Sequence, residues 1–75
     1  MEERIKEIMG AVFEIDPSTI DDSASTDTIE NWDSIRHMSL IVALEEEFGV
    51  QFDDDQIAEM QNYKLVVLSL QEAQA

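Results

Sequence analysis

Ser34 and His37 are the first residues whose types and spacing suggest chemistry, since a serine hydroxyl can act as a nucleophile and an imidazole as its base. Three positions apart on a helix, the two side chains can be neighbours. A serine hydrolase also needs an orienting group and the strained turn of a GxSxG motif, which is absent. The 75-residue chain is too short for a substrate cleft as well. We therefore predict no enzyme activity, and expect His37 to be partly buried with a structural role.

The acidic run DDD at residues 53–55 raises the question of a metal site. A calcium-binding EF-hand loop needs alternating acids, a glycine and a distal glutamate, and this pattern is not present. We predict no specific metal site. Loose binding of divalent cations, which would relieve repulsion between the acids, stays open.

Ser34 stands at the start of a predicted helix that runs to Phe48, with Asp33 as its N-cap and Gly49 as the residue that ends it. Serine is itself a common helix cap. Because Asp33 can already serve as the cap, Ser34 is left at the surface. A phosphate on its oxygen would meet unpaired backbone N–H groups and the positive end of the helix dipole. The position is suited to a phosphodiester.

The helix 34–48 carries more apolar residues than one buried face requires. On a helical wheel, one apolar stripe spans roughly 100° and matches a core face. Its members are Leu40, Ile41, Leu44 and Phe48. A second stripe lies on another side, with Glu45 and Glu46 flanking it, and consists of Ile35, Met38 and Val42. Such a stripe is either covered by another helix or left for a partner, and a small bundle can do both in part.

The other segments provide the framework for this helix. Residues 2–14 have apolar side chains at helical spacing, and Pro17 ends the helix because it disfavours helical geometry at Asp16. Residues 16–33 form a long connection, which is often functional in a compact domain. Its expected anchors to the core are Ile20, Ile29 and Trp32.

Two further helices complete the predicted fold. Asp53 and Gln56 form a capping box that opens a short helix through about Met60, and Asn62 can cap the last helix. Strand-like alternation is absent, so we predict an all-α, compact four-helix bundle in a single domain, residues 1–75, with a short third helix and a long first loop. The expected core contains Ile5, Ile8, Val12, Leu40, Leu44, Phe48 and Val67.

The charge is strongly negative, with 18 acidic and 4 basic side chains and a net charge of -14. Such a chain should avoid nucleic acid and anionic membranes and attract basic partners. Its self-repulsion predicts a fold that gains stability from salt or divalent cations. A simpler explanation, that the acids keep a small helical protein soluble, stays open.

The remaining composition indicates a soluble protein. The chain has no cysteine, hence no disulfide and no thiolate metal site. The start, MEERIKEIMG, lacks the apolar core of a signal peptide, and no run approaches the roughly 18 apolar residues of a membrane helix. We expect a cytoplasmic monomer without a membrane span.

The segment WDSIRHMSLIVALEEEFGVQF, residues 32–52, resembles the central segment of acyl carrier proteins, and the likeness extends over nearly the whole chain. In that family an Asp-Ser-Leu motif opens the second helix. The resemblance implies that Ser34, in its Asp33-Ser34 motif, carries 4′-phosphopantetheine, transferred from coenzyme A by a phosphopantetheinyl transferase. It also implies docking of acyl-loading and acyl-transfer enzymes, whose basic patches would meet acids. The implied docking residues are Ile35, Met38, Val42, Glu45 and Glu46.

Several positions depart from the commonest fatty-acid pattern. Arg36 and Ser39 stand where acids are usual, Trp32 precedes the motif, and Ile35 replaces its leucine. We therefore predict a specialised stand-alone carrier in which Arg36 tunes partner choice. On the wheel Arg36 lies beside Glu47, so it can equally be a surface arginine that pairs with Glu47 or with nothing.

Two functions stay open from the sequence. The first is an acyl carrier for fatty-acid, polyketide or another specialised biosynthesis, with the cargo unspecified. The second is a small acidic helical adaptor that binds basic proteins through the same stripe and leaves Ser34 unmodified.

Overall fold

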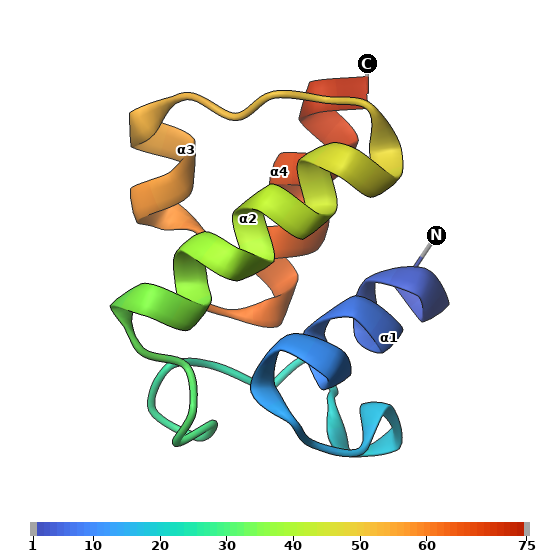
Figure 1. Ribbon diagram of the computed structural model, residues 1–75, viewed down its shortest axis with the longest axis vertical. Coiled ribbons are helices and arrows are strands. Elements are labelled where there is room, and N and C mark those ends of the chain that lie inside the picture. The colour runs from blue at the N-terminus through green and yellow to red at the C-terminus, as the bar shows by residue number, and fades with distance from the viewer. Residues whose placement is uncertain (1, 75) are drawn as a thin grey trace.

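The computed structural model describes residues 2–74, and in this part of the chain it contains four α-helices and no strand. α2 runs diagonally through the middle of the view in Figure 1, with α1 and α3 on either side of it. The molecule measures 28 × 23 × 19 Å. The all-α bundle is confirmed. In chain order the elements are α1 (Glu2–Phe13), the 3₁₀ helix η1 (Pro17–Thr19), α2 (Ser34–Phe48), α3 (Asp54–Glu59) and α4 (Tyr63–Gln74).

The end of α1 involves a close approach between the helix and the loop that follows. Glu14 adopts a left-handed backbone conformation, with φ of 57°, and the Ile15 N–H donates to the Gly10 carbonyl at 3.0 Å. A Cβ at Gly10 would lie 2.8 Å from the Pro17 ring. Gly10 therefore weakens the helix locally but lets η1 pack against it.

Local signals in the sequence set the ends of the other helices as predicted. Gly49 ends α2 in the left-handed conformation, with φ of 65°. Asp53 and Gln56 form the capping box of α3. The Asn62 side chain accepts the Leu65 N–H at 2.8 Å at the start of α4.

The long loop is held by buried anchors and by short-range turns. Its three predicted anchors, Ile20, Ile29 and Trp32, are all buried, as expected. The N–H and hydroxyl of Ser18 donate to the Asp16 carboxylate, and these hydrogen bonds lower the pKa of that carboxyl. The loop is thus an ordered part of the fold and delivers Trp32 to the start of α2.

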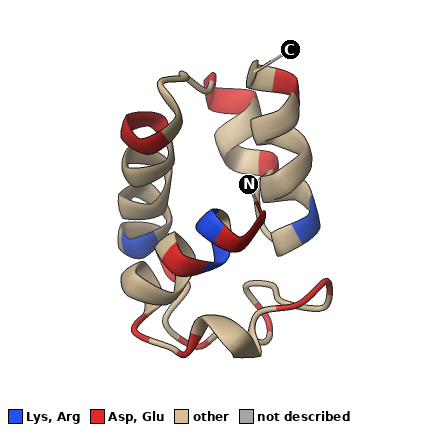
Figure 2. Cartoon of the chain, turned by 90° about the vertical axis from the view of Figure 1, so that its right-hand side faces the viewer, with Lys and Arg blue, Asp and Glu red and all other residues tan. Residues whose placement is uncertain are grey.

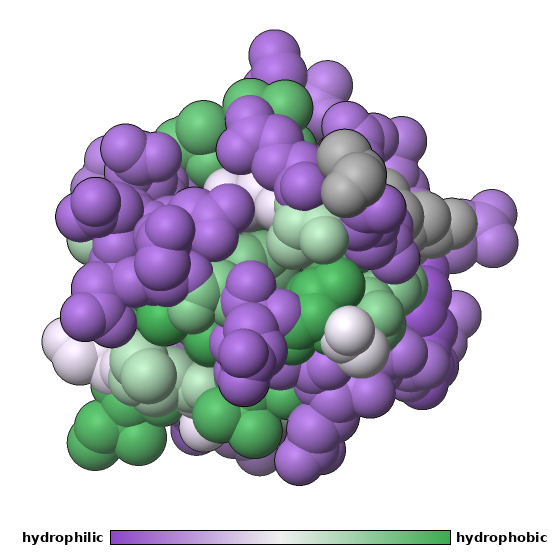
Figure 3. Space-filling view, turned by 90° about the horizontal axis from the view of Figure 1, so that it is seen from above, coloured by the Kyte–Doolittle hydropathy of each residue, from purple (hydrophilic) through white to green (hydrophobic). Residues whose placement is uncertain are grey.

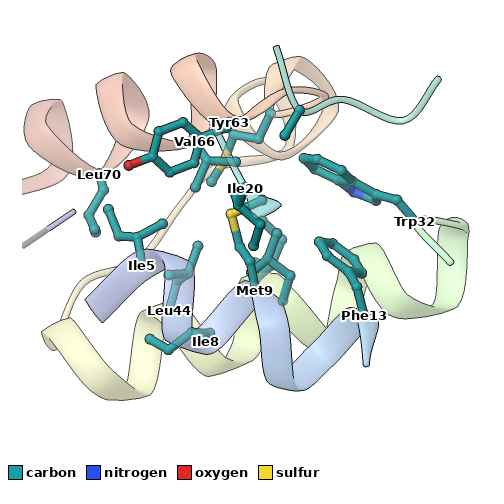
Figure 4. Close-up of a cluster of buried hydrophobic side chains, with 14 of the residues drawn as sticks. Ile5, Ile8, Met9, Phe13, Ile20, Trp32, Leu44, Tyr63, Val66 and Leu70 are labelled. Carbon is teal, nitrogen blue, oxygen red and sulfur yellow. The ribbon is translucent and has the colours of Figure 1, made fainter. Parts of the chain in front are cut away.

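The buried core comes from α1, α2, α4 and the connecting segments, several of whose side chains Figure 4 shows, and Ile57 of α3 packs against it. Phe13 packs against Trp32 with ring centroids 4.8 Å apart. Tyr63 is buried and donates to Glu2 at 3.0 Å, and burial, reinforced by that acid, raises the pKa of Tyr63 to about 12. The fully buried side chains are Ile5, Met9, Phe13, Ile20, Leu40, Ile41, Leu44, Met60, Tyr63, Val66 and Leu70.

Three predicted core residues are only half-buried: Val12, Phe48 and Val67. In α1 the buried face centres on Ile5, Met9 and Phe13, which moves Val12 to its margin. The predicted set was therefore wrong at the edges of the stripes. The sequence pattern gives the direction of an apolar face but not how far its neighbours cover it.

The stability of the fold is expected to rise with salt. Figure 2 shows acidic residues spread along the ribbon with few basic residues among them, in line with the net charge of -14. Screening should relieve their repulsion and weaken only a few exposed ion pairs. We expect the melting temperature to rise by about 5 °C between low and high sodium chloride, which corresponds to about 1 kcal/mol in a domain of this size. Equal melting temperatures at low and high sodium chloride would contradict this expectation. A comparison of magnesium chloride with sodium chloride at the same ionic strength separates general screening from specific binding of the divalent cation.

Candidate functional site

Ser34 is the first residue of α2, and its side chain is exposed. The cap of the helix is Asp33, whose carboxylate accepts the Arg36 N–H at 2.8 Å and whose carbonyl accepts the His37 N–H at 2.8 Å. Capping therefore does not occupy the Ser34 hydroxyl. The oxygen stands at the positive end of a 15-residue helix, where a phosphodiester charge would be stabilised. The residues present here fit a phosphate-linked prosthetic group.

A hollow of about 550 Å³ opens beside Ser34 between α2 and α3. Ser34 forms part of its rim together with side chains from the loop and from both helices. Its lining consists of Thr26, Trp32, Asp33, Ser34, His37, Met38, Asp54, Ile57, Ala58 and Gln61. The wall of this hollow therefore contains both polar and apolar side chains.

The second apolar stripe of α2 is exposed. The exposed fractions are 79% for Ile35, 49% for Met38 and 49% for Val42. Together with Ser34 and Ser39, these residues line a shallow groove along α2. Ile35 is open to solvent, whereas Met38 and Val42 are about half covered, and Met38 shares the hollow with Ile57 and Ala58 of α3. The bundle thus covers the stripe in part and leaves the rest exposed, which the sequence had left open. Figure 3 shows apolar side chains reaching the surface of the molecule among hydrophilic ones.

The two predicted docking acids differ in their surroundings. Glu46 is exposed, whereas Glu45 is half-buried and its carboxylate accepts the Phe52 N–H at 2.9 Å. Glu45 therefore ties the end of α2 to the loop before α3. Of the two acids, Glu46 offers the carboxylate that is more open to a partner.

Arg36 is bound to the end of α1, so the alternative of a surface arginine that pairs with Glu47 or with nothing was wrong. One guanidinium nitrogen donates to the Val12 carbonyl at 2.6 Å, and another donates to Glu14 at 2.9 Å. Glu47 is instead bound by Arg4. The reason is that the end of α1 lies beside the start of α2, so the arginine reaches an unpaired carbonyl and the negative end of the α1 dipole.

Replacing Arg36 with methionine should lower the free energy of unfolding by about 1 kcal/mol, because it removes a charged cap from α1. Arg4→Met is the matched control. Arg4 is exposed and pairs only with surface acids, so its loss should cost less than about 0.5 kcal/mol. Urea unfolding of both variants measures the difference. Equal losses would mean that Arg36 contributes no more than a surface ion pair.

His37 is half-buried with both ring nitrogens in contact with other segments, in keeping with its expected structural role. The Trp32 indole N–H donates to its Nδ1 at 2.9 Å, and its Nε2 lies 2.7 Å from the Ile57 carbonyl oxygen. The sequence did not reveal these partners. The only available signal was the proximity of Trp32 and His37 in the chain, since a backbone carbonyl has no residue signature.

Metal sites and membrane-spanning helices are two other features that would bear on function, and residues 2–74 show neither. In that range, no three or more His, Asp and Glu side chains are grouped so as to hold a metal ion. No helix there is long and apolar enough to cross a membrane.

Comparisons with known proteins agree in the kind of protein they indicate. A family model described as a phosphopantetheine attachment site matches residues 3–67. An acyl carrier protein from Thermosynechococcus vestitus is 34% identical over 65 residues, covering 87% of this chain and 80% of that protein. The solution structure of a holo acyl carrier protein from Geobacter metallireducens superposes with a TM-score of 0.86 at 25% identity, covering 97% of this chain and 84% of the other.

Proposed function

The chain belongs to the phosphopantetheine-attachment family of acyl carrier proteins, and from this premise we propose that Ser34 is its attachment residue. Its function is that of an acyl carrier with covalently attached 4′-phosphopantetheine. The observation that carries the assignment to Ser34 is that Asp33 caps α2, which leaves an exposed hydroxyl at the helix start.

The chain's own residues would support attachment as follows. The Ser34 oxygen bonds to the pantetheine-side phosphorus of coenzyme A held by a phosphopantetheinyl transferase. The pyrophosphate P–O bond breaks, adenosine 3′,5′-bisphosphate leaves, and the hydroxyl proton passes to a base on the transferase. The N–H groups of the first turn of α2 and the helix dipole then face the phosphodiester charge. When bound, the arm supplies a thiol that holds acyl groups as thioesters.

We propose that partner enzymes dock on the exposed stripe of α2, Ile35, Met38 and Val42. A partly exposed apolar strip beside the attachment residue offers contact area for a transient interface. Glu46 and, less openly, Glu45 would meet basic patches on the transferase and on acyl-loading and acyl-transfer enzymes. Association should therefore weaken as salt rises.

The carrier family is not a family of catalysts, and we propose that this chain performs no catalysis itself. The contacts of His37 support the proposal. Its Nδ1 accepts the Trp32 N–H and its Nε2 faces the Ile57 carbonyl, so neither nitrogen is available to Ser34 as a base.

The place of this carrier in metabolism is proposed from its departures from the common fatty-acid pattern. Arg36 and Ser39, two and five residues after Ser34, stand where acids are usual, which favours a specialised pathway with its own partners. We also propose that Arg36 tunes partner choice, because it stands two residues after Ser34 where an acid is usual, and its guanidinium, paired with Glu14, offers a partner no carboxylate there. The single domain 1–75, the monomeric state and the cytoplasmic location stay predictions.

Intact mass spectrometry separates the carrier from the adaptor that uses the same surface without a prosthetic group. The purified chain is incubated with coenzyme A, magnesium and a phosphopantetheinyl transferase. We expect one addition of the arm's mass and, after digestion, a modified peptide that contains Ser34. An unchanged mass with several transferases of broad specificity would favour the adaptor.

A further inference from the structure

His37 connects three segments of the chain at the site. Trp32 comes from the long loop, Ile57 from α3, and His37 itself lies in α2, three residues after Ser34. The hydrogen bonds of 2.9 and 2.7 Å hold the loop and α3 against the start of α2. Trp32, His37 and Ile57 also line the hollow beside Ser34, so this contact shapes its wall.

The two partners determine which protonation state the imidazole must have. An indole N–H only donates, so Nδ1 of His37 must accept and carries no proton. A carbonyl oxygen only accepts, so Nε2 must carry the proton. The arrangement needs the neutral imidazole. A second proton, on Nδ1, would set two N–H donors against each other and leave the buried Trp32 without its acceptor.

The charged side chains that line the hollow beside His37 are acids. The hollow has two charged side chains in its lining, Asp33 from the loop end and Asp54 from α3. The neighbouring base Arg36 is turned away and bound to the end of α1. Among residues 2–74, neither α1 nor α4 adds a charged group to that lining. The described lining of the hollow therefore places no lysine or arginine beside the imidazole.

We propose that His37 is a pH-sensitive latch whose neutral imidazole holds α3 and the Trp32 loop beside Ser34 and whose protonation releases them. Histidine is the side chain that ordinarily changes charge between about pH 5 and 8. Opening would loosen α3 and one wall of the hollow and leave the core of α1, α2 and α4 in place. The effect of the latch on arm loading rests on the proposed function of Ser34. The opening itself does not.

The structural test uses hydrogen exchange by NMR, corrected for the intrinsic exchange rate at each pH. The chain has one histidine and one tryptophan, so the Trp32 indole N–H reports on this contact alone. Between about pH 7.5 and 5.5, we expect protection of that N–H and of the α3 amides to fall roughly fivefold to tenfold in the wild type. Amides around Leu44 in α2 should keep their protection.

His37→Gln is the matched variant, because its side-chain amide can donate and accept but does not titrate. In this variant, the protection of the Trp32 indole N–H and of the α3 amides from hydrogen exchange should not change with pH, whatever its absolute value. His37→Phe keeps a ring without the hydrogen bonds and should show low protection at both pH values. If the Phe variant does not fold, the comparison of the wild type with His37→Gln still shows whether the opening depends on the titration of His37. Equal pH dependence in wild type and His37→Gln would assign the opening to carboxylates and overturn the latch.

Arm transfer by one transferase gives the functional test. The wild-type rate divided by the His37→Gln rate cancels the pH dependence of the transferase, and we expect this ratio to fall at least about threefold from pH 7.5 to 5.5. A constant ratio would overturn the coupling between latch and loading. Absence of loading in both proteins at both pH values would instead contradict the assignment of Ser34, and hydrogen exchange on Ser34→Ala would still test the opening.

Discussion

Replacing Ser34 with alanine is expected to abolish loading of the arm and to leave the fold unchanged. The hydroxyl oxygen is the atom that would bond to phosphorus, and alanine has no substitute for it. The substitution should alter the free energy of unfolding by less than about 0.5 kcal/mol, because the side chain is exposed and Asp33 provides the cap. Intact mass after incubation with coenzyme A and a transferase measures the loading, and urea unfolding measures the stability.

Ser39→Ala is the matched control for this experiment. Ser39 is also exposed on α2 and lines the same groove, and its hydroxyl donates to the Ile35 carbonyl at 3.3 Å. It should load fully. If Ser34→Ala still gained the arm, the attachment residue would lie elsewhere. Loss of loading in Ser39→Ala alone would place it at Ser39.

The helix ends were predictable because their signals are local. Each of these ends depends on residues within one turn of it. The signals are a carboxylate just before the first turn, a glycine just after the last turn, and an acid three residues before a glutamine. Asp33, Gly49 and the pair of Asp53 and Gln56 all adopt these roles. The buried loop anchors followed from their size and apolarity within a polar segment.

Contacts between distant segments were not predictable in the same way. A helical wheel describes one helix, so it placed Arg36 beside Glu47 and carried no information on α1. The guanidinium is instead bound to Val12 and Glu14, more than twenty residues earlier in the chain. Likewise, the apolar pattern of α2 revealed a surplus stripe, but only the positions of α3 and α4 decide whether it is covered.

Shortening one side chain in each apolar stripe of α2 should affect different properties. The buried stripe should govern stability, and the exposed stripe should govern docking. Leu44 is fully buried in the core, whereas Val42, two residues before it, is 49% exposed. Leu44→Ala should lower the free energy of unfolding by about 2–5 kcal/mol, because it removes buried methyl groups and leaves a cavity. That is a large part of the roughly 5–15 kcal/mol that stabilises a typical domain. Unfolding in urea measures the loss.

Val42→Ala should instead change stability by less than about 0.5 kcal/mol but weaken docking. If transferases and acyl-transfer enzymes bind the exposed stripe, removing its methyl groups should lower kcat/KM for arm transfer about fivefold to thirtyfold, the effect of about 1–2 kcal/mol at an interface. Leu68→Ala on α4 provides the control, since Leu68 is also 49% exposed but lies outside the stripe. This substitution should alter neither the free energy of unfolding nor kcat/KM for arm transfer. Equal slowing by Val42→Ala and Leu68→Ala would show that exposed apolar area in general, rather than the stripe beside Ser34, governs docking.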